Sequence, residues 1–273
     1  MSEPLERQHI LITGGGTGIG LACAKLLRAD GGVVTIMGRR AAKLEEARAS
    51  LTADGGAEVR IAAGDVSNES DVAAAVKVAL DANGALHGCV AGAGTGTFGP
   101  LMDTPLSQWE NVLSTNLTGT MLTIKHAARA MTNGGSIVAI SSIAGVLTHR
   151  WMTAYCVSKA GVEMLARNAA DELGGAGIRV NAVRPGLVPT DLAAGLVNNP
   201  AANADYLDQM PLRRLGTPED IANIVRFLIG PESSWVTGQV IASDGGHTLR
   251  RGPDLDPLAK MAMKADQSHP YAG

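Results

Sequence analysis

Short β-branched segments alternate with Ala- and Leu-rich segments along most of this chain. Each short segment predicts a strand, and the longer stretches between them have the periodicity of helices. Repeated βαβ units cross over right-handedly, so they build one parallel sheet with helices on both faces. The sequence therefore predicts a single α/β domain with a Rossmann-type, doubly wound parallel sheet of about seven strands. The predicted strands cover residues 10–13, 33–37, 59–62, 88–91, 136–140, 178–183 and 239–242.

Composition and charge agree with this fold and exclude several kinds of partner. Hydrophobic residues make up 45% of the 273-residue chain and aromatic residues only 3%, which suits a core of small aliphatic side chains around buried parallel strands. A net charge of −3 provides no basic surface for nucleic acid. The apolar segments are shorter than the roughly 18 residues of a membrane span, and the polar start is not typical of a secretory signal. We expect a cytoplasmic protein that binds neither nucleic acid nor membrane.

The cysteines and histidines are not spaced as metal ligands. Cys23, Cys89 and Cys156 stand singly, without a CxxC or CxxH pattern, and the six histidines are likewise scattered. The cysteines are expected to be small buried side chains. We therefore predict no metal site.

A glycine-rich segment, TGGGTGIG, follows the first predicted strand and precedes a helical pattern. Its glycines let the backbone turn tightly and approach a pyrophosphate, which then meets the free N–H groups at the start of the helix. No lysine follows, as a P-loop would require. A plain connecting turn is the alternative, but the flanking strand and helix favour a dinucleotide site. The residues expected there are Gly14, Thr17, Gly18, Ile19 and Gly20.

Two arginines follow the second predicted strand, where a dinucleotide-binding fold recognises the ribose of its cofactor. An acidic residue at this point binds a free 2′-hydroxyl, and an arginine binds a 2′-phosphate. Arg39 and Arg40 stand here, and no carboxylate lies between Val33 and Ala42. The pair favours NADP over NAD as the cofactor, and a solvated arginine pair at the start of a surface helix is the alternative.

Ser142, Tyr155 and Lys159 form the most specific constellation in the chain. Tyr155 and Lys159 are four residues apart in an Ala- and Leu-rich helical stretch, so they project from the same face. A neighbouring ammonium favours the phenolate and lowers the pKa of a tyrosine, which makes proton transfer feasible near neutral pH. Ser142 follows the preceding predicted strand at the edge of the sheet where ligands bind. By themselves, the tyrosine and lysine would indicate only packing and a solvated charge.

In this order and spacing, the motifs resemble those of the short-chain dehydrogenase/reductase (SDR) family. Where the family commonly has Asn-Asn-Ala-Gly after the fourth strand, this chain has Ala91-Gly92-Ala93-Gly94, which puts local stability and cofactor affinity in question. The resemblance covers roughly residues 9–246. It rests on the TGxxxGxG turn, Asp65-Val66, Asn116, Ser142, Tyr155-Cys156-Val157-Ser158-Lys159, Pro185-Gly186 and Thr190.

The resemblance implies catalytic roles for four residues. Tyr155 would give its proton to a carbonyl oxygen while hydride leaves the nicotinamide, and Ser142 would hydrogen-bond the same oxygen. Lys159 would bind the nicotinamide ribose and tune Tyr155. Asn116 would hold a water that links Lys159 to bulk solvent.

The resemblance also implies contacts to the dinucleotide. Asp65 and the Val66 backbone would hold the adenine, and Thr190 the carboxamide. A turn at the end of a strand is the alternative for Asp65, as for Pro185-Gly186. The other residues expected at the cofactor are Ala93, Gly94, Tyr155, Lys159, Pro185, Gly186 and Val188.

Residues 1–246 are expected to form one dinucleotide-binding catalytic domain. Segment 190–215 is apolar and irregular, with several prolines, which makes it a candidate lid over the substrate. The tail, residues 247–273, is rich in charge and proline and is expected either to be partly disordered or to dock on a neighbouring subunit. The family resemblance implies a homotetramer built through two long helices, at about 107–131 and 154–173.

The leading hypothesis is an oxidoreductase that moves a hydride between NADP(H) and the carbonyl or secondary alcohol of a moderately apolar small molecule. The candidate pocket residues are apolar, although the core or a subunit interface is the commoner place for such side chains. They are Phe98, Trp151, Met152, Leu187 and residues 192–210.

Two alternatives stay open. A reductase of 3-oxoacyl thioesters, carried on CoA or an acyl carrier protein, would need basic residues at the mouth, which Arg150, Arg213 and Arg214 could supply. A non-catalytic dinucleotide-binding sensor would keep the fold without the chemistry, but it would have no need of the serine, tyrosine and lysine together.

Overall fold

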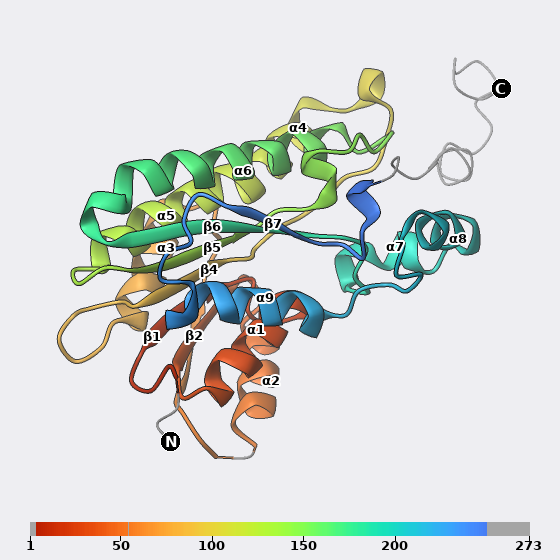
Figure 1. The fold of residues 1–273 in the computed structure, drawn as a ribbon. Coiled ribbons are helices and arrows are strands. Elements are labelled where there is room, and N and C mark those ends of the chain that lie inside the picture. Colours follow the sequence, from red (N-terminus) through yellow and green to blue (C-terminus); the bar gives the residue numbers. More distant parts are fainter. Residues whose placement is uncertain (1–3, 54, 250–273) are drawn as a thin grey trace.

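The protein is described by a computed structural model that covers residues 4–53 and 55–249. Seven strands form one parallel sheet in the order β3-β2-β1-β4-β5-β6-β7, with helices on both faces (Figure 1). The predicted doubly wound α/β fold is confirmed, and the predicted strand ends agree with the observed ones within about two residues. The strands are β1 (His9–Thr13), β2 (Val33–Gly38), β3 (Val59–Ala63), β4 (Gly88–Ala91), β5 (Gly135–Ile140), β6 (Ile178–Pro185) and β7 (Val240–Ser243).

The strand order reverses between β1 and β4. The chain builds β1, β2 and β3 to one side and then returns to place β4 on the other side of β1. In such a sheet the ligand crevice opens beyond the carboxyl ends of the strands at this reversal. The segments that follow β1, β4, β5 and β6 therefore define the ligand-binding edge.

Alternate side chains of the strands enter two separate cores. In β1, Ile10 and Ile12 pack with α1 (Gly18–Ala29), α2 (Ala41–Thr52) and α9 (Pro218–Ile229). Leu11 faces the opposite core, built with the helices of the other layer (Figure 1). That layer contains α3 (Glu69–Ala79), α4 (Leu106–Leu113), α5 (Gly119–Ala130) and α6 (Thr153–Leu173).

The three cysteines lie in different environments. Cys23 and Cys89 are fully buried small side chains in the two cores, as the sequence predicts. Cys156, on α6, is only partly buried. Burial raises the pKa of both Cys23 and Cys89 to about 12, so these thiols stay protonated and inert.

The predicted long helix at residues 107–131 is divided by a π-helical turn, Ser114–Thr118, between α4 and α5. The hydroxyl of Thr120, in the first turn of α5, donates to the Asn116 carbonyl of this turn at 2.7 Å. The side chain of Asn116 is bonded to Thr95 of the neighbouring loop, so a tertiary contact stabilises the altered helical turn. Hydrophobic periodicity alone does not reveal such a contact.

Segment 190–215 is more regular than the sequence predicts. It contains α7 (Ala194–Val197) and α8 (Pro200–Gln209), which lie beyond one end of the sheet in Figure 1. The side chain of Asn199 caps α8 by accepting from the Ala202 N–H at 3.0 Å, and Pro200 occupies the first helical position. Of the two prolines in the segment, Pro200 and Pro211, the first therefore starts a helix rather than marking irregular chain.

An ion pair between Arg214 and Asp220 holds the segment after α8 against the start of α9. Arg214 makes two bonds to the Asp220 carboxylate, at 2.6 and 2.9 Å, and Thr217 and Asp220 form a reciprocal capping box at the start of α9. Residues 247–249 form a short 3₁₀ turn with a fully buried His247. The rest of the predicted tail, 250–273, lies outside the described residues.

Candidate active site

A cavity of about 450 Å³ opens at the carboxyl ends of β1, β4, β5 and β6, where the strand order reverses. A smaller hollow of about 150 Å³ lies toward the ends of β2 and β3. The two are separated by backbone that lines both, at Gly14, Thr17, Ala93 and Gly94. Two adjoining hollows of this kind suit an extended ligand that places one part in each hollow.

The glycine-rich turn between β1 and α1 leaves no room for side chains. Gly14 has φ +71° and Gly18 φ +51°, in the left-handed region that favours glycine. A Cβ at Gly14 would lie 2.9 Å from the backbone of Ala93, and one at Gly20 would lie 2.2 Å from the Gly14 oxygen. Thr17 precedes α1 without a side-chain cap, which leaves the first N–H groups of the helix for a ligand. The turn therefore fits a dinucleotide pyrophosphate.

The segment that departs from the family pattern is held by β1. The hydroxyl of Thr13 accepts from the N–H of Gly92 at 3.1 Å and from that of Ala93 at 3.4 Å. A Cβ at Gly92 would lie 2.9 Å from the Thr13 carbonyl oxygen. The family pattern has two asparagines at the positions of Ala91 and Gly92. In this chain, Thr13 provides polar contacts to the backbone of the same segment.

Three cations line the smaller hollow. Arg39 Nη1 lies 3.9 Å from Asp65 Oδ2, and its side chain is 65% exposed. Arg40 precedes α2 and is exposed, while Lys43 stands in the first turn of that helix, paired with Glu46 at 2.6 Å. Lys43 was missing from the sequence prediction. Its position three residues after Arg40 at a helix start was the available signal.

Asp65 and Val66 close the other side of this hollow. Asp65 Oδ1 accepts from the N–H and hydroxyl of Ser67, at 2.9 and 2.8 Å. Burial raises the pKa of Asp65, but the Ser67 hydrogen bonds and the charge of Arg39 outweigh it and lower the pKa overall. Val66 is buried against Gly119, where a Cβ would lie 2.7 Å from Val66 Cγ2. Asp65 therefore forms a turn and still lines the hollow.

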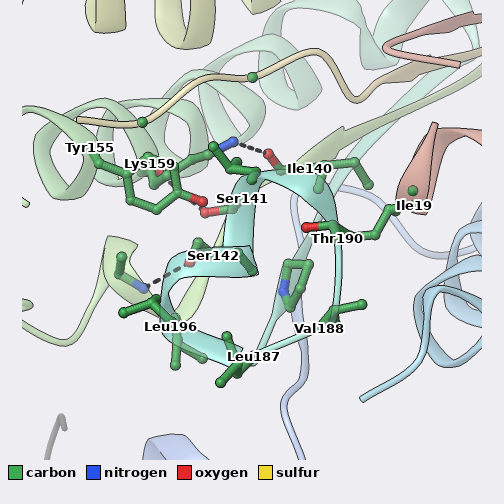
Figure 2. Close-up of a pocket in the computed structure, with 18 of the residues that line it drawn as sticks. Ile19, Ile140, Ser141, Ser142, Tyr155, Lys159, Leu187, Val188, Thr190 and Leu196 are labelled. Atoms are coloured by element: carbon green, nitrogen blue, oxygen red, sulfur yellow. Dashed lines mark hydrogen bonds between the residues drawn. The ribbon is translucent and has the colours of Figure 1, made fainter. Parts of the chain in front are cut away.

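Ser142, Tyr155 and Lys159 meet at the wall of the larger cavity (Figure 2). Tyr155 and Lys159 project from the start of α6, and Lys159 Nζ lies 5.7 Å from the centre of the Tyr155 ring. Ser142 follows β5, and its side chain is close enough to the Tyr155 phenol to lower the pKa of that phenol. The Ser142 hydroxyl accepts from the Ala144 N–H at 3.2 Å. The three residues that the sequence singles out are thus brought together.

Burial controls the protonation of this trio. Lys159 Nζ donates to the Ile140 carbonyl at 2.8 Å, and burial lowers the pKa of Lys159 to about 8. The pKa of Tyr155, predicted from the sequence to fall beside the ammonium, is instead raised by burial, with the Ser142 hydrogen bond opposing that rise. The cause is desolvation, which destabilises the phenolate. The sequence pattern does not show how deeply Tyr155 is buried, so it does not reveal this effect.

Asn116 stands behind the cavity wall rather than on it. Its side chain is fully buried, accepts from the Thr95 N–H at 2.8 Å, and donates to the Thr95 carbonyl at 2.9 Å and to Ser158 Oγ at 3.0 Å. A Cβ at Gly94 would lie 3.5 Å from Asn116 Oδ1 and 3.7 Å from Lys159 Nζ. Asn116 therefore fixes the loop after β4 against α6, directly beside the lysine.

A buried ion pair lies on the far side of the trio. Glu163 on α6 accepts from Arg184 of β6 at 2.8 and 2.7 Å, and from the Ser141 hydroxyl at 2.9 Å. The Ser141 hydroxyl also approaches the Lys159 carbonyl at 3.2 Å. This network joins the ends of β5 and β6 to α6, and sequence reasoning missed it because its members are distant in the chain.

The segment after β6 forms the wall opposite Tyr155. Pro185, Gly186, Val188 and Thr190 line the larger cavity, and Figure 2 shows Thr190 beside Ile19 across from Tyr155 and Lys159. The remaining predicted cofactor residues thus lie along the same crevice as the glycine turn. Thr190 also packs at Gly18, where a Cβ would lie 3.1 Å from Thr190 Cγ2.

The apolar side chains predicted for the substrate pocket divide into two groups. Phe98, Met152 and Leu187 line the cavity, together with Leu192 and Leu196 of segment 190–215. Trp151 and Met210 are buried in a small core with Ile143 and Tyr206 and are not among the lining residues. For Trp151 the pocket prediction is therefore wrong, because the loop before α6 turns its ring into that core.

Two polar side chains in this compartment were not recognised from the sequence as a pair. His149, in the loop before α6, lines the cavity and is 5% exposed, and Tyr206 of α8 lines it and is 2% exposed. Their ring centres are 6.3 Å apart. No sequence motif marks His149, which reaches the cavity only through the path of its loop.

Across residues 4–53 and 55–249, no three His, Cys, Asp or Glu side chains gather as metal ligands. Within those ranges, no helix has both the length and the hydropathy to cross a bilayer.

Comparison with known proteins identifies the family. A family model described as enoyl-(acyl carrier protein) reductase matches residues 14–248. The chain is 37% identical over 254 residues to 2-(S)-hydroxypropyl-CoM dehydrogenase 3 of Xanthobacter autotrophicus, covering 91% of this chain and 99% of that protein. It is 35% identical over 250 residues to a 3-oxoacyl-(acyl-carrier-protein) reductase of Chlamydia pneumoniae, covering 91% and 100%.

A solved structure gives the same result. A short-chain type dehydrogenase/reductase from Mycobacterium ulcerans superposes with a TM-score of 0.92 at 43% identity, covering 96% of this chain and 97% of that one. The chain belongs to the short-chain dehydrogenase/reductase family. It is therefore an oxidoreductase of the kind that uses a nicotinamide dinucleotide.

Proposed function

We propose that this oxidoreductase uses NADP(H) to interconvert a ketone and a secondary alcohol on a small, moderately apolar molecule. The observation that carries the proposal is the convergence of Ser142, Tyr155 and Lys159 on a cavity beside the glycine turn. The apolar side chains around the rest of that cavity support an apolar substrate body.

The polar residues act on one substrate oxygen. The bound nicotinamide supplies or accepts the hydride at the reacting carbon. Tyr155 gives its proton to the carbonyl oxygen during reduction, and the raised pKa of Tyr155 keeps that proton in place beforehand. Ser142, whose side chain lies beside the same phenol, donates to this oxygen and stabilises the charge that develops on it.

Lys159 prepares the tyrosine and holds the cofactor ribose. Its ammonium lies 5.7 Å from the Tyr155 ring centre and stabilises the phenolate left after proton transfer. Asn116 positions the loop beside Lys159 and is proposed to support the water that reloads its proton. Since the pKa of Lys159 is about 8, this proton is exchangeable near neutral pH.

The preference for NADP rests on the charges of the smaller hollow. Arg39, Arg40 and Lys43 all line it, which suits a 2′-phosphate. The carboxylate of Asp65 also lines this hollow. The Arg39 guanidinium lies 3.9 Å from that carboxylate and offsets its negative charge.

A homo-oligomer, of the tetrameric kind that the family resemblance implies, is part of the proposal. The outer face of α4, α5 and α6 exposes large apolar side chains, of which Leu106 is 69% and Met164 54% exposed. Exposed apolar side chains of this kind favour contact with another subunit.

The thioester alternative has weaker support at the cavity mouth. Arg214 is engaged in two bonds with Asp220 at the start of α9, and the Arg150 guanidinium stacks 5.4 Å from the Trp151 ring centre. Both side chains thus have structural partners. The sensor alternative does not explain why the serine, tyrosine and lysine occur together at one cavity.

The direct test is Tyr155→Phe, assayed with NADPH on a panel of ketones, hydroxysteroids, sugars and acyl thioesters. We expect NADPH to bind the variant with nearly the wild-type Kd, measured by fluorescence, while turnover falls at least about a thousandfold. Wild-type protein that binds NADPH but turns over no carbonyl compound would support the sensor instead.

A further inference from the structure

The substrate compartment is short of positive charge. Of the described residues that line the larger cavity, the charged ones are Lys159 and Asp191. Lys159 is committed to the Ile140 carbonyl and to the proposed proton transfer. A carboxylate, phosphate or sulfonate in this compartment would therefore meet a negative charge and no free cation, which favours an uncharged substrate.

His149 presents an unused hydrogen-bond acceptor in this compartment. Its Nδ1 lies 3.0 Å from the Leu147 carbonyl oxygen, so Nδ1 carries the proton and donates it. Burial lowers the pKa of His149 and outweighs the opposing effect of the Leu147 hydrogen bond, so the ring stays neutral. Nε2 then has a lone pair, and within the described part of the chain no group donates to it. This nitrogen is an acceptor in a largely apolar wall.

Tyr206 provides a second polar group beside it. The ring lies between His149, at 6.3 Å between ring centres, and His247, at 5.2 Å in an edge-on arrangement. Within residues 4–53 and 55–249 no group hydrogen-bonds to its hydroxyl, and the residue lines the cavity. Burial raises the pKa of Tyr206, so the hydroxyl remains a neutral donor and acceptor.

A ligand that fills the cavity removes water from the neutral polar groups that line it, which costs free energy unless the ligand supplies partners for them. We infer that the substrate carries, besides its reacting carbonyl, an uncharged hydroxyl group that donates to His149 Nε2 and contacts the Tyr206 hydroxyl. The substrate class is thus a neutral hydroxy ketone, and the product is the corresponding diol. This inference rests on the proposed function, because the reacting carbonyl is placed at Ser142 and Tyr155.

Matched cyclohexanones test the inference. The 2-, 3- and 4-hydroxycyclohexanones are compared with their methyl counterparts and with 4-oxocyclohexanecarboxylate, and kcat/KM is measured with whichever of NADPH and NADH binds more tightly. We expect the best hydroxy ketone to exceed its methyl counterpart by about tenfold or more, and the carboxylate to be the poorest substrate.

Variants assign the preference to its residues. His149→Leu should lower the hydroxy-to-methyl ratio of kcat/KM about tenfold, His149→Gln should restore part of it, and Tyr206→Phe should lower it less. His126→Leu, outside the cavity on α5, is the matched control and should leave the ratio unchanged. Cofactor binding by fluorescence shows that each variant is folded.

The possible results separate this inference from the proposed function. Equal kcat/KM for hydroxy and methyl ketones, preference for the carboxylate, or an unchanged ratio in His149→Leu would overturn the inference alone. Absence of turnover on every ketone by dinucleotide-bound wild-type protein would contradict the proposed function, and the inference with it.

Discussion

Glu163 and Arg184 form a two-point ion pair that joins α6 to β6 immediately behind the proposed catalytic residues. The Glu163 side chain is 4% exposed and also accepts from the hydroxyl of Ser141, the residue before Ser142. The guanidinium has a raised pKa because of its hydrogen bonds to Glu163, so it stays charged. One buried carboxylate thus holds both the strand end that bears Ser142 and the helix that bears Tyr155.

Breaking this pair should be costly, because it leaves an uncompensated buried charge. We expect Glu163→Gln and Arg184→Met each to lower the free energy of unfolding by about 3 kcal/mol, measured by urea denaturation at pH 7. The double variant Glu163→Gln/Arg184→Met should recover a large part of that loss. Additive losses in the double variant would show that the pair is not coupled.

An exposed pair provides the control for this experiment. Arg48 and Glu45 on α2 are 2.7 Å apart, and each side chain is 50% exposed. Neutralising either one should change the free energy of unfolding by less than about 0.5 kcal/mol, because solvent screens the interaction.

Lys159 should destabilise the fold at neutral pH. Its pKa falls from 10.5 to about 8 on burial, so below pH 8 the folded state carries a desolvated ammonium. From pH 8 to 10.5 the folded state has released this proton while the unfolded state still holds it, so wild-type stability rises relative to a variant without the group. Lys159→Met should therefore be more stable at pH 7 by about 2 kcal/mol, after the lost Ile140 hydrogen bond is counted.

The measurement is the difference in unfolding free energy between Lys159→Met and wild type from pH 7 to 10.5. The advantage of the variant should change little below about pH 8 and shrink as the pH rises from 8 to 10.5. A difference that is constant with pH, or that grows, would mean that the ammonium is not desolvated in the folded protein.

Arg40 and Arg39 should discriminate between the two dinucleotides. Replacing either by alanine removes a charged partner of a 2′-phosphate, so the Kd for NADPH should rise about tenfold to a hundredfold while that for NADH changes less than about threefold. Arg48→Ala, an arginine of α2 outside the hollow, is the matched control. Fluorescence titration of both cofactors measures the effect, and tighter binding of NADH by the wild type would overturn the assignment of NADP.

Gly20 should tolerate no side chain. A Cβ there would lie 2.2 Å from the Gly14 oxygen, so Gly20→Ala must displace the backbone that faces the pyrophosphate. We expect at least a hundredfold weaker dinucleotide binding, with the loss of about 1 to 3 kcal/mol of stability typical of overpacking. Gly174→Ala, where an added Cβ meets nothing within 4 Å, should change neither quantity. Calorimetric titration and thermal unfolding report both.

The fold could be predicted from sequence because local signals agree with the global arrangement. The β-branched runs define strands such as β1 and β5 whatever their neighbours, and Thr217-Pro218 marks the start of α9. Prediction was less accurate where distant residues decide the local structure. The π-helical turn at Asn116 depends on its bonds to Thr95, which the periodicity of α4 and α5 does not contain.

The same distinction applies to the candidate site. Tyr155 and Lys159 are one helical turn apart, so their proximity follows from helix geometry. The contribution of His149 depends on a loop whose path no sequence pattern specifies, and the Glu163 and Arg184 pair joins residues 21 positions apart on different elements. The pKa of Tyr155 could not be judged either, because burial depends on the whole surrounding structure.

The most direct test of the central claim follows the hydride itself. Wild-type protein is incubated with a ketone substrate and NADPH deuterated at C4 on the transferred face, and the alcohol is examined by mass spectrometry and NMR. The account predicts one deuterium on the carbinol carbon, a hydroxyl proton from solvent, and no labelled alcohol with Tyr155→Phe. Labelled alcohol formed at the wild-type rate by Tyr155→Phe would contradict it.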